Sequence, residues 1–195
     1  MSENCMSKTC RHVLRRTVTA VLVSICQACS PVTVLNALVP DNGYQKLADK
    51  AYGDENRQKL DIYLPAHTIS DHPLKTVVFF YGGSWDSGSK ADYKFVAEAL
   101  TSAGYIVVIP DYRLYPEVVF PAFVDDGARA VTWVLEHINE YGGEAGHVIL
   151  AGHSAGAHIA ALLSLDATYL AKYHHQPTDV TAMIGLTSYH CKVTV

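Results

Sequence analysis

The feature that most constrains this chain is a G-x-S-x-G pentapeptide, Gly-His-Ser-Ala-Gly, at residues 152–156. The apolar run 147–151 leads directly into it, and the Ala- and Leu-rich stretch 155–165 leads directly out. A strand can turn sharply into a helix only if small residues flank the turn, because larger side chains would hold the two elements apart. The pattern predicts a strand, a tight turn and a helix, with the hydroxyl of Ser154 pushed out above the edge of a sheet.

Further apolar runs, rich in β-branched residues, occur at 76–81, 105–109 and 181–186. Their lack of polar alternation is typical of strands covered on both faces. Helical periodicity separates them, at 95–100 and at 123–138. Strands that alternate with helices predict an α/β domain with a doubly wound, mostly parallel sheet. In such sheets, functional sites lie beyond the carboxyl ends of the strands.

Two local patterns give finer expectations. Residues 60–64 alternate apolar and polar side chains, which predicts a half-buried strand that ends at Pro65. Asp125 and Asp126 fall in the first turn of the longer helix, where the helix dipole favours negative charge.

A second glycine-containing segment, Tyr-Gly-Gly-Ser-Trp at 81–85, follows the first of the apolar runs. Attack of a serine on an ester carbonyl creates an oxyanion, and loss of one backbone N–H donor to it costs about 3–4 kcal/mol. Glycines let the backbone approach that oxygen closely. We therefore expect an oxyanion hole at Gly82, Gly83 and Ser84, completed by the amide of Ala155.

These motifs together resemble the α/β-hydrolase family, in the carboxylesterase branch related to hormone-sensitive lipase and to kynurenine formamidase-like esterases. The 81–85 segment is similar to the family motif H-G-G-x-W, with Tyr81 in place of its histidine. Residues 111–117, Asp-Tyr-Arg-Leu-Tyr-Pro-Glu, resemble the family stretch D-Y-R-L-A-P-E, and the pentapeptide segment 152–158 follows in the family's order. The resemblance covers roughly residues 52–186.

The resemblance implies an α/β-hydrolase fold and a serine esterase that acts on a small ester substrate. Ser154 would be the nucleophile, with no organic cofactor and no metal. Trp85 and Tyr115 are candidates to line the pocket for the acyl or alcohol group, with simple packing as the alternative for each. A non-catalytic binding protein of the same fold, or an inactive fragment, is the alternative.

The partners that a serine nucleophile needs are difficult to find. In the family, the triad acid and base follow the serine by many tens of residues, whereas only residues 155–195 follow it here. From residue 187 the sequence departs from the family pattern, so we expect a truncated or frame-shifted C-terminus, a domain that is incomplete there, and a chain that is nearly inactive alone. Each downstream candidate has a structural explanation instead. We expect His158 to pack beneath the sheet edge and Asp166 to cap a helix. His174 and His175 should lie in an exposed loop, Asp179 should form a turn, and His190 belongs to the divergent end of the chain.

The N-terminal segment has the pattern of an export leader. Arginines between residues 11 and 16 precede the apolar run 18–25, which is too short to span a bilayer, since that needs about 20 residues. Residues 26–30, Cys-Gln-Ala-Cys-Ser, resemble a bacterial lipoprotein cleavage box with Cys29 as the lipidated residue. A frayed or buried N-terminal helix is the alternative. An exported protein is expected: periplasmic or membrane-anchored if bacterial, and otherwise secreted.

The predicted organisation is a leader at 1–30, a linker at 31–51 and a partial hydrolase domain at 52–195. A formal net charge of −4 without a basic cluster argues against a nucleic-acid partner. The 10 histidines are scattered, which favours no metal site. Residues 83–90 approach the P-loop pattern, but Ser89 stands where that motif needs lysine, so nucleotide binding is a weak alternative.

Overall fold

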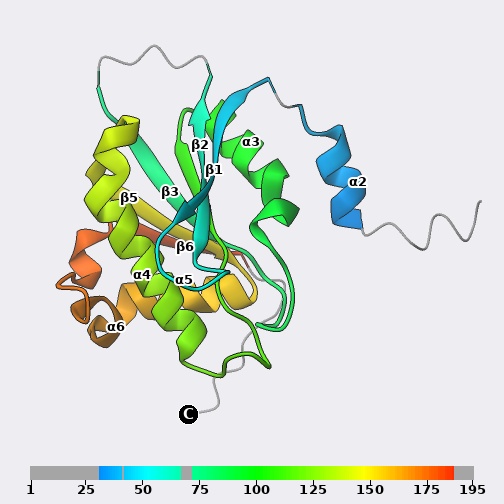
Figure 1. Cartoon of the computed structure of the whole chain (residues 1–195). Helices are drawn as coiled ribbons and strands as arrows, with labels where there is room; N and C mark the ends of the chain where they lie inside the picture. Colours follow the sequence, from blue (N-terminus) through cyan, green and yellow to red (C-terminus); the bar gives the residue numbers. More distant parts are fainter. Residues whose placement is uncertain (1–30, 41, 67–71, 187–195) are drawn as a thin grey trace, which may run out of the picture. The chain divides into compact units, whose positions relative to one another are not determined.

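The computed structural model describes residues 31–40, 42–66 and 72–186. The chain divides into two units between Leu38 and Val39. The described part of the first unit is helix α2, Pro31–Leu38. The second unit contains all the other described elements (Figure 1). The leader, Cys29 and His190 lie outside the described residues.

The second unit is organised around one mixed sheet, which confirms the predicted mostly parallel arrangement. Its strands lie in the order β1-β2-β4-β3-β5-β6. β2 is antiparallel to both of its neighbours, and the remaining pairs are parallel. The strands are β1 (Tyr44–Ala51), β2 (Lys59–Pro65), β3 (Leu74–Phe80), β4 (Ile106–Pro110), β5 (Gly143–His153) and β6 (Ala182–Leu186).

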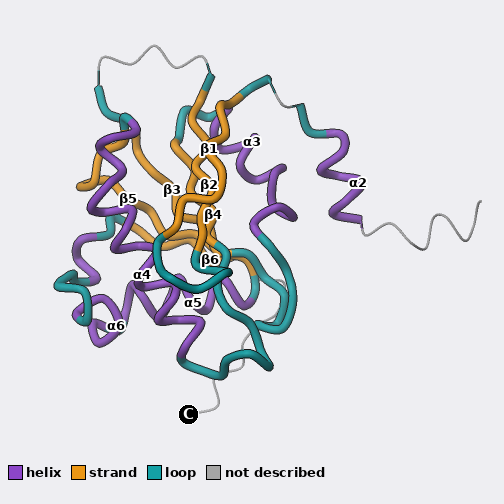
Figure 2. The backbone as a smooth tube through the Cα atoms, viewed as in Figure 1, coloured by secondary structure: helices purple, strands orange, loops and turns teal. Residues whose placement is uncertain are grey.

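Helices cover both faces of this sheet, as the alternation of strands and helices predicted. Figures 1 and 2 show α3 on one side and α4 and α5 on the other. Alternate residues of β3 explain the division, because Val77 and Phe79 face α3 whereas Phe80 lies against α4 and α5. The helices are α3 (Lys94–Ser102), α4 (Ala122–His137), α5 (Ala155–Leu165) and α6 (Ala167–Ala171), with short 3₁₀ helices η1 (Lys90–Tyr93), η2 (Ile138–Tyr141) and η3 (Pro177–Asp179).

The sheet begins earlier in the sequence than expected. Tyr44–Ala51 pairs with β2 along its length, so this part of the predicted linker is an edge strand of the domain. The prediction of a half-buried β2 is also wrong, because residues 60–63 are all buried. Asp61 lies in that stretch as a polar residue on a covered strand, and its carboxylate pairs with Lys46 and Lys90. The polar residue Asp61 in the alternating pattern therefore forms ion pairs inside the domain and does not face solvent.

β6 departs from the expectation that every apolar run is covered on both faces. All five of its residues are exposed, and β5 is its only neighbour in the described sheet. Beside it, on the α3 face, lies an apolar pocket of about 420 Å³ whose wall includes Ile184 and Leu186. In the part of the chain that the structure describes, no helix combines the length and the apolar character required to cross a membrane.

Candidate active site

The turn between β5 and α5 holds Ser154 in the geometry that its motif predicted. The residue has φ 50° and ψ −115°, a conformation that non-glycine residues rarely adopt and that the surrounding structure must enforce. Its N–H donates to the carbonyl of Leu186 at the end of β6, 2.8 Å away. Ser154 is exposed. The strand, tight turn and helix are thus confirmed, and the serine is accessible at the carboxyl edge of the sheet.

The two flanking glycines are required by close packing around this turn. A Cβ on Gly152 would fall closer than 3.0 Å to the backbone of Gly156. A Cβ on Gly156 would fall equally close to the backbone carbonyl of Phe80, the last residue of β3. Helix α5 therefore starts directly against β3, which brings the nucleophile turn to the loop that follows β3.

That loop lies against the serine, as the oxyanion-hole prediction requires. A Cβ on Gly82 would be 3.2 Å from the Cβ of Ser154 and 2.7 Å from Nδ1 of His153. Gly83 then has φ 133°, and Ser84 and Trp85 have φ 50° and 63°. Positive φ is costly for the two non-glycine residues, Ser84 and Trp85, which indicates that the contacts around the loop impose its conformation.

The four predicted oxyanion residues differ in what their amides do. The N–H of Gly82 donates to the Tyr93 hydroxyl at 3.2 Å, so it is already occupied. The amides of Gly83 and Ser84 make no hydrogen bond to another described residue. The amide of Ala155 is at the first position of α5, where a helix leaves its N–H groups without internal acceptors. Three of the four predicted donors therefore remain available for a ligand.

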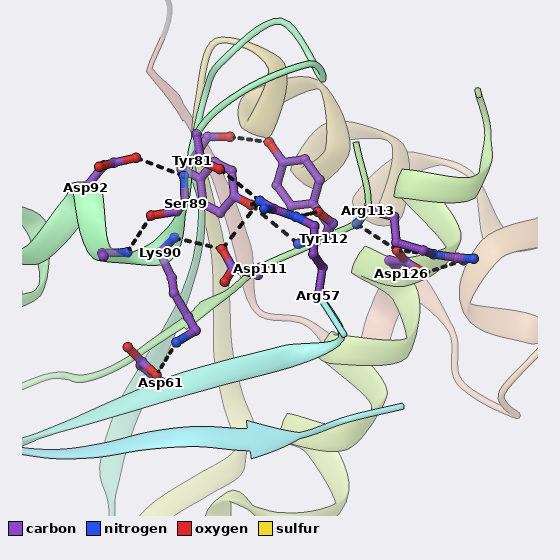
Figure 3. A network of polar contacts seen from close by, with 12 residues as sticks. Arg57, Asp61, Tyr81, Ser89, Lys90, Asp92, Asp111, Tyr112, Arg113 and Asp126 are labelled. Atoms are coloured by element: carbon purple, nitrogen blue, oxygen red, sulfur yellow. Dashed lines mark hydrogen bonds and ion pairs between the residues drawn. The ribbon is translucent and has the colours of Figure 1, made fainter. Parts of the chain in front are cut away.

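The loop rests on a buried aromatic and cationic network (Figure 3). Tyr81, which replaces the histidine of the family motif, is buried and stacks on Tyr112 with ring centroids 4.5 Å apart. Arg57 donates to the Tyr81 hydroxyl, to the Gly88 carbonyl and to the Tyr112 carbonyl, each at 2.8 Å. Burial raises the pKa of the Tyr81 and Tyr112 hydroxyls, so both remain neutral. One arginine thus fixes both ends of the loop at residues 81–88.

Lys90 and Asp111 extend this network toward β2 (Figure 3). The Lys90 ammonium contacts Asp49 at 2.7 Å and Asp61 at 2.8 Å, while its backbone N–H donates to Asp111 at 2.8 Å. Burial raises the pKa of the Asp111 carboxyl, which the Lys90 amide and the Arg57 guanidinium partly oppose. Because Lys90 is committed to carboxylates of the sheet, the P-loop alternative has no lysine for a phosphate and is wrong.

The segment that follows β4 is anchored to α4 by a buried ion pair. Arg113 contacts Asp126 with Nη2 at 2.7 Å and with Nε at 2.9 Å, and its backbone N–H donates to the same carboxylate. Gln58 donates to Asp126 as well, at 2.7 Å. Asp126 is therefore the partner of an arginine and not a charge for the helix dipole. Asp125 alone remains in the first turn of α4.

The two predicted pocket residues lie next to each other above α4. Trp85 is half-buried, stacks on Phe123 at 5.7 Å and meets His158 edge-on at 5.5 Å. Its indole Nε1 is buried and has no hydrogen-bond partner among the described residues. Tyr115 is exposed, and its N–H donates to the Trp85 carbonyl at 2.8 Å. Trp85 thus belongs to the loop at residues 81–88 and faces α4 and α5, whereas the Tyr115 ring lies on the surface.

No described histidine hydrogen-bonds to the Ser154 hydroxyl. His158 is exposed against Trp85, so the prediction that it packs beneath the sheet edge is wrong. Asp166 caps α6 by accepting from Thr168, as expected. His174 is exposed.

His175 and Asp179 form a histidine–carboxylate pair, with Nδ1 and Oδ2 3.1 Å apart. Their position excludes them as partners of the serine. Asp179 lies in η3, just before the amino end of β6, and β6 runs parallel to β5 with Ala182 opposite Ile149. Ser154 lies beyond the carboxyl end of β5, at the opposite edge of the sheet. A strand of five residues separates the pair from the serine along this direction, at about 3.3 Å per residue.

Sequence reasoning missed Arg57, Tyr93 and His153, which hold the loop and the turn in place. Arg57 lies in a polar connection before β2, and no motif distinguished it from a solvated arginine. Tyr93 ends a 3₁₀ turn, and its role follows only from the contact of its hydroxyl with His153. Among residues 31–40, 42–66 and 72–186, no group of three His, Cys, Asp or Glu side chains is placed to hold a metal ion.

The sheet order, the strained exposed serine and the glycine loop beside it define an α/β-hydrolase fold of the carboxylesterase-like class. Residues 60–187 match the BD-FAE family, and the chain belongs to it.

Relatives with curated descriptions and solved structures agree with this assignment. A probable isoprenylcysteine alpha-carbonyl methylesterase of Arabidopsis thaliana is 40% identical over 110 residues, covering 56% of this chain and 23% of the relative. A kynurenine formamidase of Danio rerio is 38% identical over 125 residues, covering 64% of this chain and 41% of the relative. Esterase B of Lactobacillus rhamnosis has the same fold, with a TM-score of 0.66 at 24% identity over 88% of this chain and 55% of its own. The chain therefore spans less than half the length of these two curated relatives.

Proposed function

We propose that this chain carries the nucleophile and oxyanion half of a serine hydrolase that cleaves carboxylic esters. The observation that carries the proposal is the strained, exposed Ser154 beside a glycine loop in which the amides of Gly83 and Ser84 have no partner among the described residues. Backbone strain persists at a site where the surrounding structure enforces it, and such strain is concentrated at functional sites. The names of the relatives support ester or formamide cleavage as the class of reaction.

The proposed reaction is acyl transfer to water. Oγ of Ser154 attacks the ester carbonyl carbon, and the amides of Gly83, Ser84 and Ala155 hold the negative charge that develops on the carbonyl oxygen. The bond to the alcohol then breaks, which leaves an acyl-serine that water hydrolyses to the acid. The serine proton must pass to a base and then to the departing alcohol. No described residue is placed as that base, so we assign this role to groups outside the described residues.

A fluorophosphonate probe tests the nucleophile directly. Intact-protein mass spectrometry of the folded chain should show one adduct, and peptide mapping should place it on Ser154. Ser154→Ala should abolish the adduct, whereas Ser164→Ala should leave it unchanged, because Ser164 hydrogen-bonds to the Ala160 carbonyl within α5. Absence of an adduct on a folded wild-type chain would contradict the proposal.

The same preparation should be assayed with p-nitrophenyl acetate, p-nitrophenyl butyrate and an aryl formamide. Turnover of the two esters above that of Ser154→Ala supports an esterase, and preference for the formamide supports an amidase of the same mechanism. Among the described residues the Ser154 hydroxyl has no hydrogen-bond partner, which favours a second candidate, a non-catalytic binding protein of this fold. Stoichiometric adduct formation without turnover of any of the three substrates would favour that second candidate or an inactive fragment.

We further propose that residues 1–30 direct export, with Cys29 as a lipid attachment site. The support is the sequence pattern of arginines, an apolar run and a cleavage box at 26–30. Expression in a bacterial host should place the protein in the membrane fraction, with the mass of a processed, acylated N-terminus. Cys29→Ser should release it, and an unprocessed soluble wild-type protein would contradict the assignment.

A further inference from the structure

We propose that Tyr93 is a positioning residue that sets the oxyanion loop at a fixed distance from the nucleophile turn. The catalytic meaning of this role rests on the function proposed above. The contact itself does not, because it consists of hydrogen bonds that can be measured in an inactive protein.

One oxygen atom joins the two segments. The Gly82 N–H donates to the Tyr93 hydroxyl at 3.2 Å, and Nδ1 of His153 lies 3.0 Å from the same hydroxyl. Gly82 immediately precedes the oxyanion donor Gly83, and His153 immediately precedes Ser154. Any displacement of the Tyr93 hydroxyl therefore acts on both halves of the site, each one peptide unit from a reacting group.

The direction of the hydrogen bonds determines a histidine tautomer. The Tyr93 oxygen accepts from the Gly82 N–H, and its own proton is free to be donated to Nδ1 of His153. A neutral imidazole has one donor and one acceptor nitrogen, so an accepting Nδ1 requires the proton on Nε2. In the opposite arrangement the Tyr93 proton would have no acceptor among the described residues. With Nδ1 as the acceptor, the imidazole proton of His153 lies on Nε2.

The Tyr93 ring is held firmly enough for this role. It packs against Phe79, Phe95 and Tyr81, with centroids 5.3, 5.6 and 6.1 Å away. The turn before it, η1, begins with a capping box in which the Ser89 and Asp92 side chains bond to backbone N–H groups. The hydroxyl is thus the tip of a packed side chain on a capped turn.

The space around Gly82 leaves little room for a substitute arrangement. A Cβ there would be 2.7 Å from Nδ1 of His153 and 3.2 Å from the Cβ of Ser154. The loop and the turn are therefore already in contact at this point. What the tyrosine adds is a restraint on how Gly82 is oriented, and hence on where the next amide in the loop points.

The test compares Tyr93→Phe with Tyr105→Phe. Both changes remove one hydroxyl and keep the ring, but the Tyr105 hydroxyl makes no hydrogen bond to another described residue. Histidine labelled with ¹⁵N reports the imidazole, and His153→Asn identifies the His153 signals. We expect Tyr93→Phe to move the Nδ1 resonance of His153 toward that of an unbonded nitrogen and to speed hydrogen exchange at the Gly82 amide about fivefold to tenfold. Tyr105→Phe should do neither.

The functional consequence is measured with the fluorophosphonate probe. We expect Tyr93→Phe to slow adduct formation about fivefold to tenfold, while Tyr105→Phe stays at the wild-type rate. Unchanged His153 and Gly82 signals in Tyr93→Phe would overturn the proposal, whatever happens to the labelling rate. Altered signals with an unchanged labelling rate would also overturn it, because the contact would then be structural only. If the wild-type chain forms no adduct, the proposed function is wrong. The two NMR signals then show by themselves whether the Tyr93 hydroxyl bonds to Gly82 and His153.

Discussion

The two sides of Ser154 are built very differently. On the side of β3 and β4, the loop at 81–88 lies over buried aromatic rings and is tied to Arg57 by two hydrogen bonds, and a third joins Arg57 to the Tyr112 carbonyl. On the side of β6, the neighbouring strand is exposed along its whole length, and the pocket beside it is open and apolar. The first side provides the groups that would stabilise an oxyanion. The second contributes to the serine, among described residues, the carbonyl of Leu186.

This difference shows that the oxyanion donors and the proton-accepting groups of a hydrolase site come from different parts of the chain. The groups that receive negative charge are backbone amides, so short local motifs are sufficient to place them. The groups that remove the serine proton are side chains that must come from elsewhere in the fold. A chain can therefore hold a well-ordered nucleophile turn and oxyanion loop without the groups that activate the serine.

The largest expected contrast comes from adding one methyl group on each side of the nucleophile. Gly156→Ala would place a Cβ into the backbone of β3, so we expect a loss of about 3–5 kcal/mol in the free energy of unfolding. Gly185→Ala would place its Cβ 3.6 Å from the Cβ of Ala157, an ordinary contact, and should cost less than about 1 kcal/mol. Urea denaturation followed by circular dichroism measures both. Equal effects would show that β6 packs as tightly as β3.

A matched pair of isoleucines tests the same contrast in the sheet itself. Ile106 in β4 has 0% exposure, and Ile184 in β6 has 49%. Ile106→Ala should destabilise the fold by about 2–5 kcal/mol, because it leaves a cavity in a closed core. Ile184→Ala should cost less than about 1 kcal/mol, because half of that side chain already meets solvent. If Ile184→Ala proves as costly as Ile106→Ala in thermal unfolding, then something covers β6 in solution.

The sequence was a good guide where one segment determines its own structure. The pentapeptide at 152–156 predicted a turn whose glycines are needed for contact with neighbouring backbone, and the structure has that turn. Contacts between distant segments were not predictable in this way. Asp61 looked like a solvent-facing residue of an alternating strand, because nothing local indicates that Lys46 and Lys90 approach it from other elements. The same holds for Tyr93 and His153, which are far apart in the sequence.

The cation beneath the loop at 81–88 should contribute more to stability than a cation on the surface, by a smaller margin than in the preceding pairs. Arg57→Met removes three hydrogen bonds beneath the oxyanion loop and should cost about 2–3 kcal/mol. Lys172→Met on α6 removes an exposed ion pair with Asp125 and should cost about 0.5 kcal/mol or less. Chemical denaturation gives both values. A loss below about 1 kcal/mol for Arg57→Met would mean that the loop is held mainly by the stacking of Tyr81 on Tyr112.

The smallest expected effect concerns the histidines on the β6 side and along α5. His158→Ala and His175→Ala should each leave the rate of fluorophosphonate labelling of Ser154 within about twofold of wild type, because neither imidazole hydrogen-bonds to the serine. His175 contacts Asp179 just before the amino end of β6, at the opposite edge of the sheet from Ser154.

His158 is the sharper test, since it lies one helical turn after Ser154 and its ring meets Trp85 at the edge of the oxyanion loop. Labelling rates of the wild type and of His158→Ala, measured from pH 5 to pH 9, show whether His158 acts as the base. A tenfold loss of labelling rate in His158→Ala would identify His158 as the base and overturn the division between the two sides. A labelling rate within about twofold of wild type would leave the activating groups outside the described residues.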